Sequence, residues 1–483
     1  MTTNPLNVDT PSSALDLQAG ASQYQTNFRF SSAVQSPSSS SSRPSLHQEV
    51  MKSQILREFK SATFLVDLTT EGAPFHADSN DVQAVLGRLR HHYGTTDTTL
   101  LSDDDSSVDS PRFPPSGFQK EGKSYKPLIH FLNVIVRATN ECLLPSPRYL
   151  RGLHFDHHGR EMEEIYNSRR PLKPDALGLL RSPISHQQKL SWKDVAIIVE
   201  VKDQVPELIQ QLSTYAHCYL AVDRRRSFAT AIGFNHKSLQ IFFFAFHRSG
   251  LSSSGPISLR TSEGFQTVVK HMVGILSIPD EEAFGLDMTR HGNVYRINDR
   301  DYDIVRQICV RNSVRGRATV VYSLKCTQFP ISSITHLTYA SCPVHTTGAQ
   351  DNPVNLRSRT LMLAGGVTQL PDRIVYKLSY QTEGHTFEGP LFSGFLGQFG
   401  IVDVVGFQLC APEEPFGNTE YLIRNGSLWN FTQGVTGTPE KRRLHCTAMS
   451  FECLPLLDTS DKEAGIPTPT ELLETILHAM IGK

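Results

Sequence analysis

The spacing of apolar residues changes near residue 140, which predicts two kinds of structure along the chain. Residues 81–90 and 127–139 repeat apolar positions every three or four residues, as amphipathic helices do. Beyond them, short apolar runs alternate with helical stretches, and after residue 302 the runs are mostly strand-like. The predicted strands are 177–180, 195–201, 227–234, 239–247, 318–325, 374–380, 400–409 and 444–451, and the later predicted helices are 205–220, 265–276 and 470–480. This alternation favours an α/β domain around a small sheet, followed by a strand-rich domain.

Composition adds a division of the chain into four regions. Residues 1–45 are rich in Ser, Thr, Asn, Gln and Pro, and they are too poor in apolar residues to offset the entropy of ordering, so we expect a disordered tail. Residues 46–120 are expected to form a helical preamble that ends in an acidic linker, which we interpret as solvated. The α/β domain is predicted at 121–300 and the strand-rich domain at 301–483.

Charge and cysteine usage argue against several classes of function. A formal net charge of −1 gives no global attraction to nucleic acid or to an anionic membrane. The eight cysteines contain no C-x-x-C pair, which indicates reduced thiols rather than a disulfide framework or a zinc site. A local basic cluster, Arg224 to Arg226, is interpreted as an exposed turn. No secretory signal and no apolar window of membrane-spanning length occur, so we expect an intracellular protein, cytoplasmic or nuclear, with neither a membrane nor a nucleic-acid partner.

Two carboxylates and a lysine form the first candidate site. Asp175 follows Pro174 just before one predicted strand, and Glu200 and Lys202 lie two residues apart at the end of the next, so these two share a face. If the strands pair, Asp175 joins them at one sheet edge, where two carboxylates could hold Mg²⁺ and the lysine could help polarise a phosphodiester. The alternative is structural: an ion pair between Glu200 and Lys202, with Asp175 beginning a turn.

The order P-D, then E-x-K, resembles the PD-(D/E)XK nuclease-like fold. The following predicted helix carries Gln211 and Tyr215, whose spacing is similar to a Q-x-x-x-Y element of some members of that superfamily. The resemblance implies an α/β fold for residues 121–300. Because a fold does not determine its chemistry, nuclease activity is a separate hypothesis, which would use Asp175, Glu200 and Lys202.

The second candidate site resembles half of a protein kinase. An Arg-Gly-Arg-Ala-Thr loop at 315–319 precedes a strand, Lys377 lies in a later strand, and Glu388 follows it. This order is similar to a kinase N-lobe, in which a glycine loop covers the phosphates, a strand lysine neutralises them and a helix glutamate holds that lysine. A strand lysine that simply points to water is the alternative for Lys377. The sequence Gly389-Pro390 is also unfavourable for a helix interior beside Glu388.

Together the two constellations resemble the fungal-type protein kinases, from about residue 120 to the end. The resemblance implies a multidomain α+β protein: a PD-(D/E)XK-like domain, then a kinase N-lobe with a five-stranded antiparallel sheet and a helix. It also implies ATP and Mg²⁺ as cofactors, with Arg317, Thr319, Lys377 and Glu388 at the nucleotide. Two positions depart from the family pattern, namely Ala318 in place of a loop glycine and His247 in place of the aspartate of a D-R-S-G element.

The family continues into an H-R-D loop and a D-F-G segment, and neither triplet occurs in this sequence. We therefore expect a kinase homologue for Ser/Thr phosphotransfer that is truncated before the catalytic loop, lacks the C-lobe and is inactive, with no catalytic residue. The helix at 470–480 would then expose apolar residues, which favours a protein partner that covers it. Two alternatives stay open: a Mg²⁺-dependent nuclease and a non-catalytic interaction protein.

Overall fold

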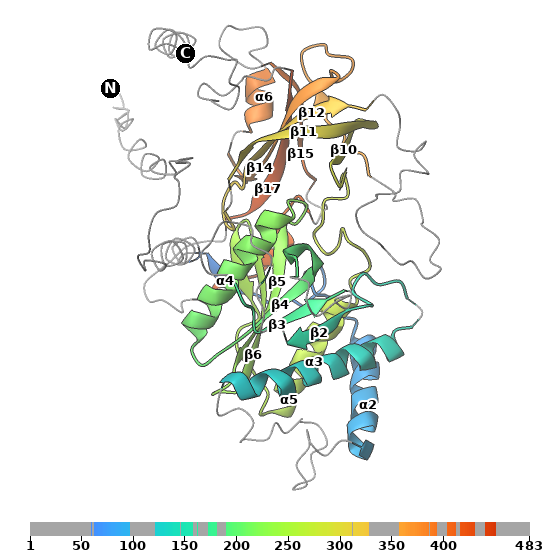
Figure 1. Ribbon diagram of the computed structural model, residues 1–483, viewed down its shortest axis with the longest axis vertical. Helices are drawn as coiled ribbons and strands as arrows, with labels where there is room; N and C mark the ends of the chain where they lie inside the picture. The colour runs from blue at the N-terminus through green and yellow to red at the C-terminus, as the bar shows by residue number, and fades with distance from the viewer. Residues whose placement is uncertain are drawn as a thin grey trace, which may run out of the picture. The chain divides into compact units, whose positions relative to one another are not determined.

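Two β-sheets contain the named strands of the described chain (Figure 1). The computed structural model describes residues 59, 62–96, 121–144, 146–157, 162, 172–180, 190–311, 313–327, 357–385, 387–393, 403–411, 416–429 and 440–450. All of them belong to one unit, Pro44–Lys483. The expected tail at 1–45, most of the acidic linker and the expected helix at 470–480 lie outside the described residues.

The first sheet is mixed, with nine strands in the order β16-β1-β7-β6-β5-β4-β3-β2 and β8 beside β6. Its strands are β1 (Thr63–Leu65), β2 (His154–His157), β3 (Ala176–Leu179), β4 (Val195–Lys202), β5 (Phe228–Asn235), β6 (Gln240–His247), β7 (Gly250–Ser253), β8 (Ile257–Ser258) and β16 (Ser427–Leu428). The pairs β4–β5 and β1–β7 are parallel and the other pairs are antiparallel. The four longer strands predicted between 177 and 247 are all present.

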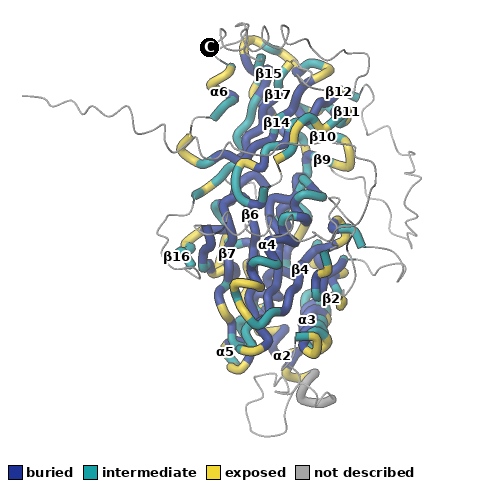
Figure 2. Tube along the Cα trace, turned by 60° about the vertical axis from the view of Figure 1, so that its left-hand side comes forward, coloured by how far each residue is buried: buried dark blue, intermediate teal, exposed yellow. Residues whose placement is uncertain are grey.

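Helices cover both faces of the first sheet. On one face, α4 (Val205–Val222) packs against alternate residues of β4 and β6 such as Ile198 and Phe244. On the other, α2 (Ser79–Thr96), α3 (Glu121–Cys142) and α5 (Ser262–Leu276) share a core with residues such as Val199 and Phe243. The strands of this sheet, β4 and β6 among them, are mostly buried (Figure 2). Because both faces are buried, β4 to β6 are almost continuously apolar rather than alternating.

The N-terminal ends of α5 and α4 show why the sequence begins helices there. The Thr261 side chain caps α5 by accepting a hydrogen bond from the backbone N–H of Gly264 at 3.1 Å. α4 begins with Val205 and Pro206, a position where a proline costs no helical hydrogen bond. α2 ends at Thr96 and α3 begins at Glu121, so the two helices border the region predicted as the acidic linker. Within the described residues, no helix is both long enough and apolar enough to cross a membrane.

The second sheet is antiparallel, with the order β13-β15-β17-β14-β12-β11-β10-β9. Its strands are β9 (Arg290–His291), β10 (Val294–Ile297), β11 (Arg300–Val310), β12 (Val320–Cys326), β13 (Met362–Leu363), β14 (Arg373–Thr382), β15 (Val404–Leu409) and β17 (Arg442–Met449). Two short helices, α6 (Glu388–Ser393) and α7 (Glu420–Ile423), follow in the same part of the chain. Tyr295, Tyr322 and Tyr376 are fully buried in the core of this sheet.

The strands cross the region boundaries predicted at residues 120 and 300. β1 comes from the 46–120 region, and β16, from the 301–483 region, pairs with it at the edge of the first sheet. β9 and β10 precede residue 300 but belong to the second sheet. Leu422 and Ile423 of α7 also pack into a core of the first sheet. Each sheet therefore contains strands from outside the region predicted for it, and a distant segment completes the first sheet.

Candidate functional site

A lysine and a glutamate form an ion pair on the second sheet. Lys377 lies in the middle of β14, opposite Val321 of β12 and Thr447 of β17. Its ammonium contacts the Oε2 atom of Glu388, the first residue of α6. The two side chains are 25% and 24% exposed, so the pair is partly shielded from water. The structure thus pairs Lys377 with Glu388, two of the four residues that the sequence placed at a nucleotide; Arg317, a third, contacts the same glutamate.

The sequence Gly389-Pro390 is compatible with this helix because α6 begins at Glu388. Pro390 then lies in the first turn, where its missing N–H costs no hydrogen bond. Gly389 allows the helix to approach the sheet closely, since a Cβ atom there would be 2.5 Å from the Cβ atom of Phe407 and 3.0 Å from Nε2 of His445. Glycine at this position therefore lets Glu388 reach Lys377.

His445 lies beside the ion pair without adding charge to it. Phe387 stacks on its ring with centroids 5.5 Å apart, and its Nδ1 atom is 3.3 Å from Nε2 of Gln381. Burial lowers the pKa of His445 to about 4, an effect that Glu388 opposes and Lys377 reinforces. The imidazole is therefore neutral at physiological pH, and the charges at this site come from acidic and basic side chains.

The loop between β11 and β12 lies next to the same glutamate. The Arg317 guanidinium is 3.4 Å from Oε1 of Glu388, and the Thr319 hydroxyl is 3.2 Å from that of Ser379 on β14. Gly316 has a φ of +115° and Ala318 one of +42°. Both values lie in the region that favours glycine, so Ala318 adopts a backbone conformation that is strained for its side chain. The loop alanine thus occupies a position with a glycine-like conformation.

On the first sheet, the two predicted carboxylates and the predicted lysine also lie together. β3 and β4 pair antiparallel, with Ala176 opposite Val199, so Asp175 lies next to the end of β4. The Nζ atom of Lys202 is 2.7 Å from Oε1 of Glu200 and 3.6 Å from Oδ2 of Asp175. Asp175 and Glu200 also accept hydrogen bonds across the strand pair, from the backbone N–H groups of Val201 and Asp175 at 2.9 and 3.4 Å.

Helix α3 adds two residues to this carboxylate cluster that the sequence reasoning missed. The Oε1 atom of Glu121 is 2.8 Å from Nζ of Lys202. The Tyr125 hydroxyl donates to that same Glu121 oxygen at 3.2 Å. Both come from the first turns of α3, just after the predicted linker, and no spacing in the sequence connects them with β4. A single lysine therefore faces three carboxyl groups.

The electrostatics of the cluster follow from burial and from this excess of carboxyl groups. Burial and the neighbouring Asp175 raise the pKa of Glu200 to about 8, although Lys202 opposes the shift. Burial also raises the pKa of Asp175, again against the effect of Lys202. Burial alone would lower the pKa of Lys202, but Glu200 and Asp175 outweigh it and raise that pKa. The cluster thus keeps a proton on a carboxyl group near neutral pH.

The Gln211 and Tyr215 pair predicted on the following helix supports the strand that carries Asp175. Gln211 donates from Nε2 to the Tyr215 hydroxyl at 2.6 Å, and that hydroxyl donates to the Lys173 carbonyl at 2.9 Å. α4 therefore fixes the backbone two residues before Asp175. Among the described residues, no group of three or more His, Cys, Asp or Glu side chains is arranged to hold a metal ion. Any metal at Asp175 and Glu200 would need further ligands, such as water or backbone oxygen.

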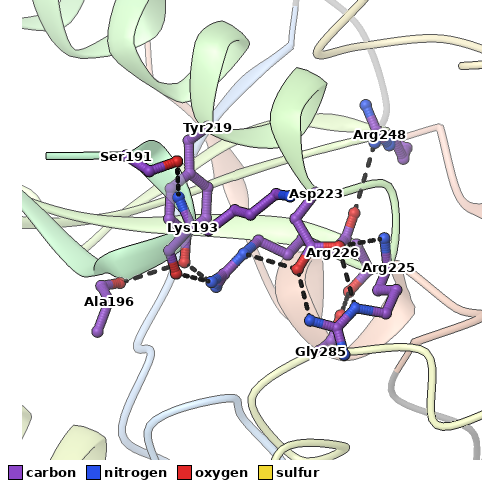
Figure 3. Close-up of polar contacts among 10 residues, drawn as sticks. Ser191, Lys193, Ala196, Tyr219, Asp223, Arg225, Arg226, Arg248 and Gly285 are labelled. Atoms are coloured by element: carbon purple, nitrogen blue, oxygen red, sulfur yellow. Dashed lines mark hydrogen bonds and ion pairs between the residues drawn. The ribbon is translucent and has the colours of Figure 1, made fainter. Parts of the chain in front are cut away.

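The basic cluster at 224–226 differs from the exposed turn that the sequence suggested. Arg226 is buried, its guanidinium donates to the Tyr219 hydroxyl, and its Cζ atom lies 4.2 Å from the centre of that ring (Figure 3). Asp223, at the end of α4, forms ion pairs with Arg225 at 2.8 Å and Arg226 at 3.8 Å. Arg226 is buried because α4 supplies both an acceptor and a counter-charge, which residue spacing alone did not reveal.

Part of the chain is similar to a known protein family. Residues 174–333 match the family described as fungal protein kinase. The matched segment is less than half of the chain; it contains Asp175, Glu200, Lys202, Arg317 and Thr319 and ends before Lys377. No curated protein and no solved structure matches the chain. The match supports the fungal protein kinase family for this protein, and with it a kinase-like function at the level of the family.

Proposed function

We propose that the second sheet binds ATP as the nucleotide-binding lobe of a fungal protein kinase. The observation that carries the proposal is the ion pair between Lys377 on β14 and Glu388 on α6. Protein kinases use such a pair, with the lysine on a central strand and the glutamate on the following helix, to place the ammonium at the nucleotide phosphates. The family match at 174–333 is consistent with this interpretation.

The order of strands around Lys377 supports the proposal. β11, β12, β14, β17 and β15 are neighbours in that order, and every pair among them is antiparallel. These are five strands with a short helix between β14 and β15, as expected for an N-lobe. The loop at 311–319 connects the first two strands, in the position of a phosphate-covering loop.

The side chains at this site fit an anionic ligand. Lys377 has three donor hydrogens, so it can keep Glu388 as a partner while it donates to a phosphate oxygen. The Arg317 side chain is 60% exposed and its contact with Glu388 is long, so it is free to turn toward a ligand at small cost. Bound ATP would supply a transferable phosphoryl group, and the residues described here would hold and orient it.

The proposal is restricted to nucleotide binding. The 483 residues contain neither an H-R-D nor a D-F-G triplet, whose acids accept the proton of the substrate hydroxyl and hold Mg²⁺ on ATP. Near Lys377, the carboxylate of Glu388 is already engaged by Lys377 and Arg317. We therefore expect these residues to bind ATP without transferring its phosphate.

Calorimetric titration of the whole chain with ATP tests the proposal, with Lys377→Met as the variant. The matched control is Lys325→Met, an exposed lysine on the neighbouring strand β12. We expect Lys377→Met to weaken ATP binding at least tenfold, because a charge-assisted hydrogen bond contributes about 1.5–3 kcal/mol, whereas the control leaves affinity unchanged. A wild-type chain that shows no binding at millimolar ATP, or equal affinity in Lys377→Met, refutes the proposal.

A second function, Mg²⁺-dependent phosphodiester cleavage, is favoured by one observation: Asp175, Glu200 and Lys202 converge at one sheet edge. Carboxylate oxygens are the ligands that Mg²⁺ prefers, and a cation held by Asp175 and Glu200, with water as its further ligands, would replace Lys202 as the partner of Glu200. Single-stranded and duplex DNA incubated with Mg²⁺ provide the test. Cleavage by the wild type that is lost in Glu200→Ala supports this function, and cleavage that survives Glu200→Ala contradicts it. Glu207→Ala, an exposed glutamate on α4, is the control.

A further inference from the structure

The turn between β6 and β7, formed by residues 247–250, connects the first sheet to the loop at 311–319. The Arg248 guanidinium donates to the Ser313 carbonyl at 2.6 Å and lies 3.4 Å from that of Val314. In return, the backbone N–H of Gly316 donates to the Arg248 carbonyl at 2.9 Å. One residue of the first sheet thus contacts three residues of the loop, through its main chain and through its side chain.

Arg248 occupies a defined position between the two sheets. It is only 3% exposed, and its Cζ atom lies 5.6 Å from the ring centre of Tyr380 on β14. The backbone N–H of Tyr380 donates to the Arg317 carbonyl at 2.7 Å. Arg248 therefore holds the start of the loop, and β14, which carries Lys377, holds its end. The loop tip at Arg317 and Ala318 is placed by both.

The turn itself is fixed by other segments, so it can act as a rigid support. The Ser249 hydroxyl is 2.6 Å from that of Thr419, and a Cβ atom at Gly250 would lie 2.0 Å from the Ala62 carbonyl oxygen. His247 accepts from the Ser249 N–H at Nδ1, 3.2 Å away, and its Nε2 atom is 3.0 Å from the Ser252 hydroxyl. These contacts leave the turn little freedom to move independently of the first sheet.

We propose that Arg248 is a positioning residue for the nucleotide loop, through which the first sheet sets the affinity of the second sheet for ATP. This inference rests on the proposed function. An arginine suits the task because its planar guanidinium donates in several fixed directions while it stacks on an aromatic ring, which a lysine ammonium does not do. The first sheet would then act as a support for nucleotide binding without contacting the nucleotide.

The test measures amide hydrogen exchange over residues 313–318 and the ATP dissociation constant, on the whole chain. The variants are Arg248→Met and, in case it does not fold, Arg248→Lys. The matched control is Arg226→Met, because Arg226 is also buried but its side chain donates to Tyr219 and to the Lys193 carbonyl, away from the loop. The Arg226 main-chain carbonyl, which accepts from the Arg248 guanidinium at 3.5 Å, is kept in this variant. We expect both methionine variants to lower the Tm. Only Arg248→Met should also speed amide exchange in the loop and weaken ATP binding, by roughly tenfold. Arg248→Lys should show a smaller effect of the same kind.

The two readouts separate the possible failures. Unchanged loop exchange in the Arg248 variants, or exchange that rises equally in Arg226→Met, refutes the positioning role even if ATP binds normally. Faster loop exchange with unaltered ATP affinity refutes the coupling to the nucleotide. A wild-type chain that does not bind ATP refutes the proposed function, and this inference with it, whatever the exchange rates show.

Discussion

Replacing Glu200 by glutamine should change how the stability of the protein depends on pH. The Glu200 side chain is 2% exposed, and burial together with Asp175 raises its pKa from 4.5 to about 8. Between these two pH values the folded chain binds a proton more tightly than the unfolded chain. The free energy of unfolding therefore falls as pH rises through this window, with the stabilising effect fully present only below about 4.5.

The size of this effect follows from the shift. Each pKa unit corresponds to about 1.36 kcal/mol, so the wild type should lose at most roughly 4 kcal/mol between pH 5 and pH 8 from this group. Glutamine does not titrate, so Glu200→Gln removes this loss while it keeps the shape of the side chain. The pKa of about 8 already includes the opposing effect of Lys202, so the loss of this ion pair in the variant does not change the sign of the difference. The stability of the variant still depends on pH, but less steeply, because the pKa of Asp175 is also raised.

Urea unfolding at pH 5, 6, 7 and 8 measures the prediction. The wild type, Glu200→Gln and the exposed-site control Glu207→Gln are compared under identical salt conditions. We expect the free energy of unfolding of the wild type to fall by at least about 1 kcal/mol more than that of Glu200→Gln between pH 5 and pH 8. The control should lose as much stability over this range as the wild type. Curves for wild type and Glu200→Gln that run parallel from pH 5 to pH 8, or that diverge in the opposite sense, refute the reasoning about the buried carboxyl group.

Two further predictions concern the backbone near the ion pair. Gly389→Ala should destabilise the protein by about 1–3 kcal/mol in urea unfolding, because the added methyl group would overlap Phe407. The control is Gly87→Ala on α2, where no atom lies within 4 Å of the added methyl group, and it should stabilise the protein by up to about 1 kcal/mol. Equal effects at the two glycines would contradict this account. Ala318→Gly should raise stability by roughly 0.5–1 kcal/mol in the same assay, because glycine adopts a φ of +42° without strain, and a loss of stability would show that the loop is not strained.

The sequence predicted well those parts of the fold that depend on local apolar patterns. α4, α5 and the strands β4 to β6 bury long continuous apolar segments, so their periodicity identified them within a few residues. β1 and β16 contain only three and two residues, and they exist because distant segments pair with them. Such pairing depends on tertiary contacts, which no short window of sequence contains.

The candidate site shows the same division. Lys377 and Glu388 could be paired in advance because the order of motifs along the chain suggested this ion pair. Glu121 could not, because it reaches Lys202 only through the packing of α3 near the end of β4. Arg226 looked exposed because three consecutive arginines usually face water, yet its guanidinium donates to Tyr219 and pairs with Asp223 inside the protein.

The pairing of β1 with β16 has a consequence for how the protein can be produced and dissected. β1 lies between β7 and β16, so its free edge is covered only when residues 427–428 are present. A ribosome must therefore synthesise most of the chain before that edge is closed, and until then its open backbone groups can pair with another molecule. Expression fragments cut between the two sheets would also lack Leu422 and Ile423 from the core. Fragments for biochemical work should accordingly carry both sheets.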